Sequence, residues 1–528
     1  MPSQRLQRLH LPLTTALLRW AGALICAVLT GCASLPSTVD RPVSTALAQP
    51  EDTRLGALVA ARAQQAGTRN DSGFALVGDA QQAFSSRMAL IQAAQKTLDL
   101  QYYAIFADDT TERLLAALRD AAHRGVRIRI LLDDFNTSGK NAQVLKLAFE
   151  RNIDLRLFNP LPGGRGSMAL RVLSNLKDTA RMQRRMHNKM LVADNAVAIT
   201  GGRNLGETYF GQSQDSNFID IDMLAAGRMA RELSRSFDQY WNNPLAYPVE
   251  SLMTVQEIEA LKPPPEPVSA DAAPAPPTLP GTMDLGSFRW TWAPSALLVD
   301  KPSKIAADAD TTDAQQDTAV DGLLQLMGQA QRTLLIVSPY FVPGERMLKA
   351  FADLRRRGVQ IRVLTNSLAS TDAPAAHVGY ARYRKALLGL GIALYEMRAE
   401  QKGTFRRLGT TALGSSNSGI RASLHSKMVV VDDSWLVVGS MNLDLRSQLQ
   451  NSEVAIIVRS SAISAEATRL VEPTLAHGAY HVELQDQRLL WRAPPGAAFS
   501  DARSEPDASL GLQFFTTLMA PFAPDEML

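Results

Sequence analysis

Two stretches of the chain repeat one spacing of chemically distinctive residues, and this repeat constrains the fold more than any other feature. Residues 186–194 read MHNKMLVAD, and residues 424–432 read LHSKMVVVD. Each stretch contains His-x-Lys, four further residues and Asp, and each is followed by an apolar run and then by GGRN or GSMN. Only seven histidines occur in the whole chain, so two of them in one long pattern indicate two related halves.

The surroundings of the two motifs are duplicated as well. Upstream of the first motif the chain reads AAQKTLDLQYYAI and ERLLAALRDAAHRGVRIRILLDD, and upstream of the second it reads QAQRTLLIVSPYFVP and ERMLKAFADLRRRGVQIRVLTNS. Gly125 and Gly358 occupy matching positions, where each predicts the end of a helix before an alternating strand. Helices that alternate with strands predict an α/β fold in which each half is an α/β/α layered unit with a buried sheet.

The N-terminus predicts a secretion signal. Basic residues Arg5, Arg8 and Arg19 precede an apolar run over residues 20–29, which is shorter than the ~20 residues that span a bilayer. The run ends in Leu-Thr-Gly-Cys32, which resembles the lipobox of bacterial lipoproteins. That resemblance implies a lipidated Cys32 at the mature N-terminus, and the following Ala33 favours the outer membrane over the inner one. The alternative is a plain signal peptide or anchoring helix in which Cys32 is incidental.

Composition restricts the other partners. Lysine and arginine number 55 against 52 acidic residues, a net charge of +3, so no nucleic-acid partner is expected. Both cysteines lie within the first 32 residues, which leaves no cysteine zinc site in the rest of the chain. Glycine-rich phosphate loops and His-Glu-x-x-His spacing are absent. We therefore expect no metal and no cofactor.

Five segments follow from these features. They are a lipoprotein signal peptide (1–31), an N-terminal tether (32–69), a first half with the first motif (70–261), a Pro/Ala-rich connector (262–281) and a second half with the second motif and an apolar tail (282–528). The tail reads LGLQFFTTLMAPFAPDEML. It fits either a membrane interface or a terminal segment packed on the domain surface.

Each motif predicts a β-hairpin, with turns at Asp194-Asn195 and at Asp432-Asp433. Seven residues of strand would place each motif Asp ~20 Å from its histidine. Asp194 and Asp432 are therefore predicted to be structural turn residues.

The same hairpins place other side chains near the histidines. With two-residue turns, Gly202 would face His187 and Ser440 would face His425, which makes both candidate pocket or oxyanion residues. Lys189 and Lys427 share the faces of their histidines, and Asn204 and Asn442 come within reach. Because the motif Asp residues are distant, we predict that Asp220 and Glu453, on the following strands, hold the imidazole tautomers.

These motifs carry a resemblance to the phospholipase D superfamily, whose hallmark is a pair of His-x-Lys-x4-Asp-x6-Gly-[Gly/Ser]-x-Asn patterns. The resemblance implies two halves around a pseudo-twofold axis that share one active site. It also implies metal-independent phosphodiester exchange, in which one histidine attacks phosphorus and the other acts as general acid and base. We assign His187 as nucleophile and His425 as acid/base, although the sequence symmetry permits the reverse. The lysines and asparagines would stabilise charge on the phosphoryl oxygens.

Within that superfamily the chain most resembles cardiolipin synthases of the C type, through TLDLQYYAI, RMHNKMLVADNAVAITGGRNLGETYFG, HVGYARYRKALLGLGIALYEM and LHSKMVVVDDSWLVVGSMNLDLRS. The resemblance implies membrane phospholipid partners and transfer of a phosphatidyl group to phosphatidylglycerol, with phosphatidylethanolamine as an alternative donor. A phospholipase D that forms phosphatidic acid is the alternative, and a nuclease or a non-catalytic envelope protein is more distant. Arg181, Arg184 and Arg185 fit either headgroup contacts or a solvated basic face.

Overall fold

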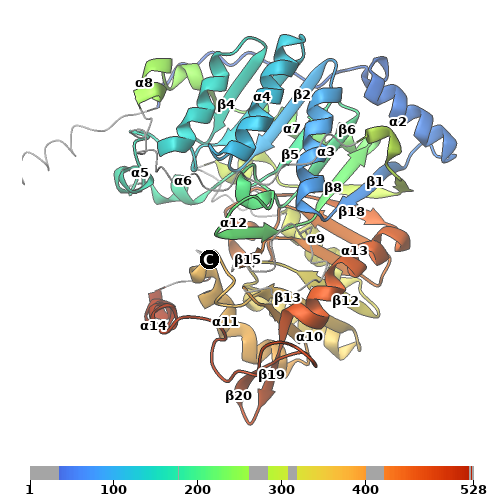
Figure 1. Cartoon of the computed structure of the whole chain (residues 1–528), viewed down its shortest axis with the longest axis vertical. Helices are drawn as coiled ribbons and strands as arrows, with labels where there is room; N and C mark the ends of the chain where they lie inside the picture. Colours follow the sequence, from blue (N-terminus) through green and yellow to red (C-terminus); the bar gives the residue numbers. More distant parts are fainter. Residues whose placement is uncertain are drawn as a thin grey trace, which may run out of the picture.

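The computed structural model describes residues 35–176, 178–260, 284–306, 318–399, 421–522 and 525. The expected signal peptide, Cys32 and the 262–281 connector lie outside these residues. Each half of the described chain contains one large mixed sheet with helices against it, and the two halves stack on one another (Figure 1). The predicted duplicated α/β fold is confirmed.

The first half contributes most of the first sheet. Its strands are β1 (Ser72–Val77), β2 (Thr97–Tyr102), β3 (Arg127–Asp133), β4 (Ile153–Phe158), β5 (Met190–Ala193), β6 (Val197–Gly201), β7 (Ser216–Ile219), β8 (Asp222–Ala226) and β9 (Ala246–Pro248). Its α-helices are α2 (Arg54–Gln65), α3 (Ala80–Ala93), α4 (Asp109–His123), α5 (Met168–Ser174), α6 (Thr179–Gln183), α7 (Arg228–Trp241) and α8 (Val255–Ala260).

The second half repeats this plan. Its strands are β10 (Thr291–Ala293), β11 (Ser295–Val299), β12 (Thr333–Val337), β13 (Gln360–Asn366), β14 (Ala393–Met397), β15 (Arg421–Leu424), β16 (Met428–Val431), β17 (Trp435–Gly439), β18 (Val454–Arg459), β19 (Ala479–Gln485) and β20 (Arg488–Arg492). Its α-helices are α9 (Ala319–Gly328), α10 (Gly344–Arg356), α11 (Pro374–Gly389), α12 (Leu445–Leu449), α13 (Ser461–Pro473) and α14 (Leu510–Met519).

Eight strands follow the same order in both sheets, and each sheet has one additional edge strand, β10 in the first and β20 in the second. The first sheet runs β10-β1-β8-β6-β5-β2-β3-β4-β9, and the second runs β11-β18-β17-β16-β12-β13-β14-β19-β20. β2, β3 and β4 are parallel, as are β12, β13 and β14, and the motif hairpins β5-β6 and β16-β17 pair antiparallel beside them. β10 pairs with β1 of the first sheet, so the second half, expected from residue 282, begins its own sheet only at β11.

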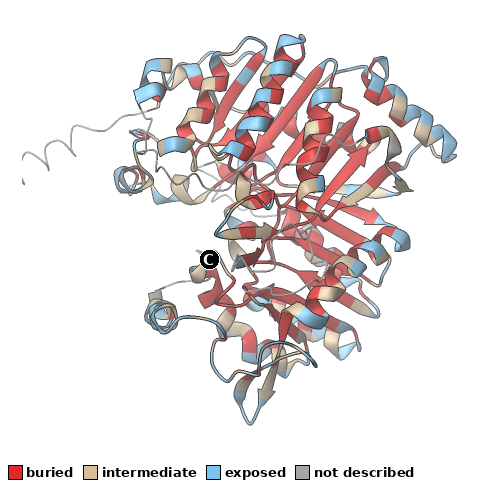
Figure 2. Ribbon diagram, in the orientation of Figure 1, coloured by how far each residue is buried: buried red, intermediate tan, exposed pale blue. Residues whose placement is uncertain are grey.

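Three hydrophobic cores hold the layers together. One lies in the first half under α3 and α4, and one in the second half under α9 and α10. The third joins the halves, because it contains Phe237 of α7 and Val471 of α13 together with Met190 and Met428 of the two motif strands. Figure 2 shows the continuous buried region across the junction. The halves therefore form one body.

Matching glycines end matching helices. Gly125 follows α4 with φ 93°, and Gly358 follows α10 with φ 85°. This left-handed conformation favours glycine because other residues place a Cβ against the backbone. Three residues, with the glycine in the middle, therefore separate each helix from the strand that carries the chain back through the sheet.

The hairpin turns have one more residue than the sequence predicts. Ala193 pairs with Val197, and Val431 pairs with Trp435, so three residues form each turn. The strands also begin at Met190 and Met428, after the His-x-Lys pairs. The predicted pairing of Gly202 with His187 and of Ser440 with His425 is therefore wrong.

Candidate active site

Each motif histidine lies where its own half contacts the other half. Parallel strands β7 and β15 pair across the junction, and the backbone N–H of His425 donates to the Ile219 carbonyl at 2.8 Å. Met186 forms an isolated parallel β-bridge with Ser452, and the backbone N–H of His187 donates to the Ser452 carbonyl at 2.9 Å. The two contacts are equivalent, because each joins the motif segment of one half to the other half. Together they bring both histidines to one site.

At these contacts, each half provides a carboxylate that binds the motif histidine of the other half. His187 Nδ1 lies 3.0 Å from both carboxylate oxygens of Glu453, and His425 Nδ1 lies 2.8 Å from Asp220 Oδ2. Both carboxylates are fully buried. A carboxylate at Nδ1 keeps the proton there and leaves Nε2 free to act. Each histidine is therefore oriented by the half to which it does not belong.

Glu453 is held in its ionised form. Ser440 Oγ donates to Oε2, and Ser447 Oγ donates to Oε1 at 3.0 Å. Although burial alone would raise it, the pKa of Glu453 is lowered by His187, Lys189 and Ser440. The Ser440 hydroxyl is thus directed to a carboxylate, and the expected oxyanion role for it is replaced by a positioning role.

Asp220 occupies a different environment. Burial raises its pKa to about 6, against the opposing effects of Lys427 and Arg203. A Cβ at position 202 would lie 2.4 Å from Asp220 Oδ2, so only glycine leaves room for this carboxylate. Gly202 therefore shapes the site by its missing side chain, and the pocket role expected for it is a steric one.

The two lysines are anchored in the same way. Lys189 Nζ donates to the His187 carbonyl at 2.7 Å, and Lys427 Nζ donates to the His425 carbonyl at 2.5 Å. Burial lowers the pKa of Lys427 to about 8 and that of Lys189 well below its usual value. One N–H bond of each ammonium is committed to the backbone, so two remain for a ligand.

The motif asparagines differ in their contacts. Asn204 Oδ1 accepts the Ala104 N–H at 3.2 Å, and its amide donates to the Tyr209 hydroxyl at 3.0 Å. Asn442 is buried, and its Oδ1 has no hydrogen-bond partner. An unpartnered buried acceptor is a position where a hydroxyl group of a ligand gains a hydrogen bond without displacing a protein group.

Burial keeps both imidazoles neutral. It lowers the pKa of His187 to about 4, against the raising effect of Glu453. It lowers the pKa of His425 well below its usual value, helped by the charges of Lys427 and Lys189. A phosphodiester anion between the lysines would offset those charges and raise the pKa of His425. Binding of an anion would therefore favour protonation of His425.

Aromatic rings line the site, although the sequence motifs did not predict them. Tyr103 packs edge-on against the His187 ring at 5.0 Å between centroids. Tyr209 and Phe218 lie 5.3 and 4.9 Å from the His425 ring, and Tyr340 lies 5.9 Å from Lys427 Nζ. Tyr103 and Tyr340 stand in the duplicated stretches after β2 and β12, which was a usable signal. Tyr209 and Phe218 have no such signal.

The motif aspartates lie at the far ends of the hairpins. Asp194 accepts three backbone N–H groups, from residues 95–97, and Asp432 accepts three from residues 331–333. Both have positive φ, of 51°, which Asp tolerates in turns. These contacts tie each hairpin tip to the start of the neighbouring central strand.

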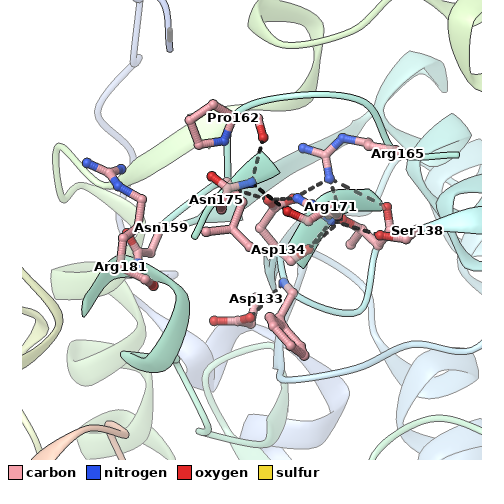
Figure 3. Close-up of polar contacts among 12 residues, drawn as sticks. Asp133, Asp134, Ser138, Asn159, Pro162, Arg165, Arg171, Asn175 and Arg181 are labelled. Atoms are coloured by element: carbon pink, nitrogen blue, oxygen red, sulfur yellow. Dashed lines mark hydrogen bonds and ion pairs between the residues drawn. The ribbon is translucent and has the colours of Figure 1, made fainter. Parts of the chain in front are cut away.

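A buried ionic cluster supports the segment before His187 (Figure 3). Asp134, directly after β3, is paired with Arg165 and Arg171 of the loop that contains α5. Asn175 closes the same loop by donating to the Pro162 carbonyl at 3.0 Å. Burial would raise the pKa of Asp134, but the two guanidinium groups lower it overall. The loop is therefore fixed beside the site by buried charge pairs.

The neighbouring carboxylate fixes the motif itself. Asp133 accepts the Met186 N–H at 2.8 Å and lies 3.3 Å from Arg185 Nη1. Arg185 is buried, so the prediction of a solvated face is wrong for this residue. Its guanidinium donates to the carbonyls of Asn159 and Arg181 and fixes the segment just before the motif histidine.

The described residues contain neither a metal-binding cluster nor a membrane-spanning helix. No group of three or more His, Cys, Asp or Glu side chains there is arranged to hold a metal ion. In the same ranges no helix has the length and hydropathy to cross a membrane.

Several known proteins are similar to this chain in sequence or in fold. The family model described as cardiolipin synthase, phospholipase D-like domain, matches residues 88–241 and 323–473. Cardiolipin synthase C of Escherichia coli is 37% identical over 72% of this chain and 80% of its own length. An uncharacterized Helicobacter pylori protein is 31% identical over 88% of this chain and 91% of its own. The crystal structure of phosphatidylserine synthase from Haemophilus influenzae has a TM-score of 0.56 at 12% identity and covers 89% of this chain and 99% of its own.

Proposed function

Because the chain belongs to the cardiolipin synthase family of the phospholipase D superfamily, and is a phosphatidyltransferase that acts on membrane phospholipids, we propose that it makes cardiolipin. In this proposal a phosphatidyl group passes from a donor phospholipid to the free hydroxyl of phosphatidylglycerol. The relative with the name cardiolipin synthase C supports this assignment. So does the absence of a bias toward basic residues, which argues against a nucleic-acid substrate.

The observation that carries the proposal is the pair of histidine–carboxylate contacts across the junction. His187 with Glu453 and His425 with Asp220 present two imidazoles to one site, with a lysine beside each. Phosphodiester exchange needs both a nucleophile and a proton donor at one phosphorus atom. A single half could provide neither of the oriented pairs.

The first step uses the lone pair of His187 Nε2. It forms an N–P bond to the donor phosphorus, the P–O bond to the leaving alcohol breaks, and His425 gives that oxygen a proton. The assignment of His187 as nucleophile is supported by the ionised state of Glu453, since a charged partner at Nδ1 makes Nε2 more basic. Asp220, whose pKa is raised to about 6, suits the histidine that exchanges protons.

The second step reverses the bonds with a new alcohol. His425 removes the proton from the acceptor hydroxyl, the acceptor oxygen forms a P–O bond, and the N–P bond to His187 breaks. No net proton is gained or lost over the two steps. Lys189, Lys427, Asn204 and Asn442 would donate to the nonbridging oxygens, whose negative charge grows at each transition state.

The enzyme is associated with a bacterial membrane, because its substrates are membrane phospholipids. We propose that acyl chains on Cys32 attach it there, with the outer membrane favoured. Helix α14 supports a membrane contact, since Leu510, Phe514 and Leu518 are more than half exposed and the helix contains no charged residue.

The test is a lipid-product assay in the presence of EDTA. Vesicles of acyl-labelled phosphatidylglycerol, with and without phosphatidylethanolamine, are incubated with the enzyme and the lipids are separated. We expect cardiolipin from the wild type and none from His187→Ala. Phosphatidic acid as the sole product would refute the transferase assignment, and a requirement for a divalent metal would refute the phosphohistidine route.

A further inference from the structure

A tyrosine–carboxylate pair stands on the His425 side of the site. Tyr340 follows β12, and Asp372 lies in the loop between β13 and α11. The Tyr340 hydroxyl donates to the Asp372 carboxylate, with Oδ1 at 3.0 Å and Oδ2 at 2.8 Å. Asp372 itself is exposed, unlike the buried carboxylates Asp220 and Glu453. It is therefore accessible to an arriving molecule.

This pair lies next to the reacting groups. The centre of the Tyr340 ring lies 5.9 Å from Lys427 Nζ, and the charge of Asp372 acts on both Lys427 and Tyr209. Tyr209 in turn packs edge-on against the His425 ring at 5.3 Å. Asp372 is thus placed on the side where the mechanism protonates one alcohol and deprotonates the next.

The other side of the site has a different charge. Tyr103, which packs on His187, lies close to the neutral side chain of Asn136, in the loop after β3 that corresponds to the loop of Asp372. The charged groups that act on Tyr103 include the cations Arg446 and Arg185, together with the buried Asp133. The pseudo-symmetric halves therefore present an exposed carboxylate on the His425 side and a neutral amide at the corresponding loop.

A carboxylate at the opening of a phosphodiester site has an electrostatic cost, because it repels the substrate anion. It is useful there only for a part of the substrate that is neutral or cationic. A carboxylate has about four lone-pair positions, and Tyr340 occupies two of them, so further hydroxyl groups can be accepted. The same charge disfavours a headgroup whose terminal group is anionic, whereas the terminal glycerol of phosphatidylglycerol is neutral.

We propose that Asp372 and Tyr340 form an acceptor subsite that binds the additional hydroxyl groups of a polyol, such as the glycerol headgroup of a phospholipid or free glycerol. The inference rests on the proposed function, since it names what holds the acceptor beside His425. Asp372 accepts a hydroxyl of the polyol that does not react, and this contact directs the reacting hydroxyl to His425. Water and simple alcohols lack the second hydroxyl and gain nothing from the subsite.

The test is a competition between two alcohols in one reaction. Phosphatidylglycerol vesicles are incubated with equal concentrations of glycerol and n-propanol, each with its own isotope, and the isotope ratio in the lipid product is measured. The ratio does not depend on the total activity of a variant. Asp372→Asn should lower the glycerol-to-propanol ratio about tenfold, as expected when a charged acceptor of a substrate hydroxyl is lost. Tyr340→Phe should lower it less, because the carboxylate remains.

The control is Asp353→Asn. Asp353 is an exposed carboxylate on α10 that pairs with Arg356 on the surface, and its replacement should leave the ratio unchanged. An unchanged ratio in Asp372→Asn, or an equal change in the control, would overturn the subsite. A wild-type enzyme that labels neither alcohol but releases phosphatidic acid would refute the transfer reaction itself, and the subsite with it.

Discussion

The hydrogen bonds of Asp194 predict a variant that loses stability and retains chemistry. Its carboxylate is completely buried and accepts the N–H groups of Gln95, Lys96 and Thr97 at 2.9, 2.8 and 3.0 Å. Asparagine fits the same positive φ and the same volume. Asp194→Asn therefore changes little except the charge and one acceptor, which becomes an NH₂ group that faces another donor.

The second half provides a matched control. Asp432 accepts the N–H groups of residues 331–333 at 2.9, 2.7 and 2.9 Å, but its side chain is only partly buried, whereas that of Asp194 is fully buried. Water can replace the lost acceptor there. Asp432→Asn has the same chemistry as Asp194→Asn without the burial.

The two variants should differ in cost. An unsatisfied buried donor costs about 1–3 kcal/mol, and loss of the charge weakens the two remaining bonds, so Asp194→Asn should cost about 3 kcal/mol. Asp432→Asn should cost about 1 kcal/mol or less. In a folding unit of 150–250 residues, 1 kcal/mol shifts the midpoint by about 2–4 °C. The joined halves form a larger unit, so the losses should be at most about 6–12 °C for Asp194→Asn and at most about 4 °C for Asp432→Asn.

Scanning calorimetry and lipid turnover measure the two effects separately. Below its transition, folded Asp194→Asn should turn over substrate at a rate within about twofold of the wild type, because the hairpin tip is remote from the histidines. Equal midpoint losses in the two variants would refute the burial reasoning. A folded Asp194→Asn enzyme without turnover would show that this aspartate takes part in the chemistry.

Four other outcomes are expected. His187→Ala and His425→Ala should each lower turnover by about 10³-fold or more in the lipid-product assay, and substantial activity in either would contradict a shared site. Burial raises the pKa of Asp444 from 3.8 to about 7, so the ionised carboxylate destabilises the fold and the wild type loses stability as pH rises through that range. Asp444→Asn, which preserves the cap of α12, should therefore raise the calorimetric midpoint more near pH 8 than near pH 5, and an equal gain at both would contradict the burial effect. Cys32→Ser should abolish labelling by palmitate, and persistent label would exclude lipidation at this residue. Phe514→Ser should reduce cosedimentation with phospholipid vesicles, because it removes a large exposed apolar side chain from α14, and unchanged cosedimentation would place the membrane contact elsewhere.

The histidine motifs show how far local sequence information reaches. Spacing alone identified His187, His425 and their lysines as a repeated set, and strand length alone separated Asp194 from the chemistry. Both inferences depend on distances along a few consecutive residues, which backbone geometry fixes. The hairpin register was predicted wrongly because the sequence did not reveal a third residue in each turn, and one residue of slip moves every partner.

The sequence by itself determined that the protein is a duplicated α/β enzyme with two histidine motifs, because periodicity and repeated spacing are properties of the chain. Only the tertiary structure decided which carboxylate serves which histidine. Glu453 reaches His187 and Asp220 reaches His425 through strand contacts between residues more than 200 positions apart. The same is true of Asp372, whose place beside Lys427 depends on the packing of separate loops. Such contacts are set by how the two sheets meet across their shared core, and no local pattern records that.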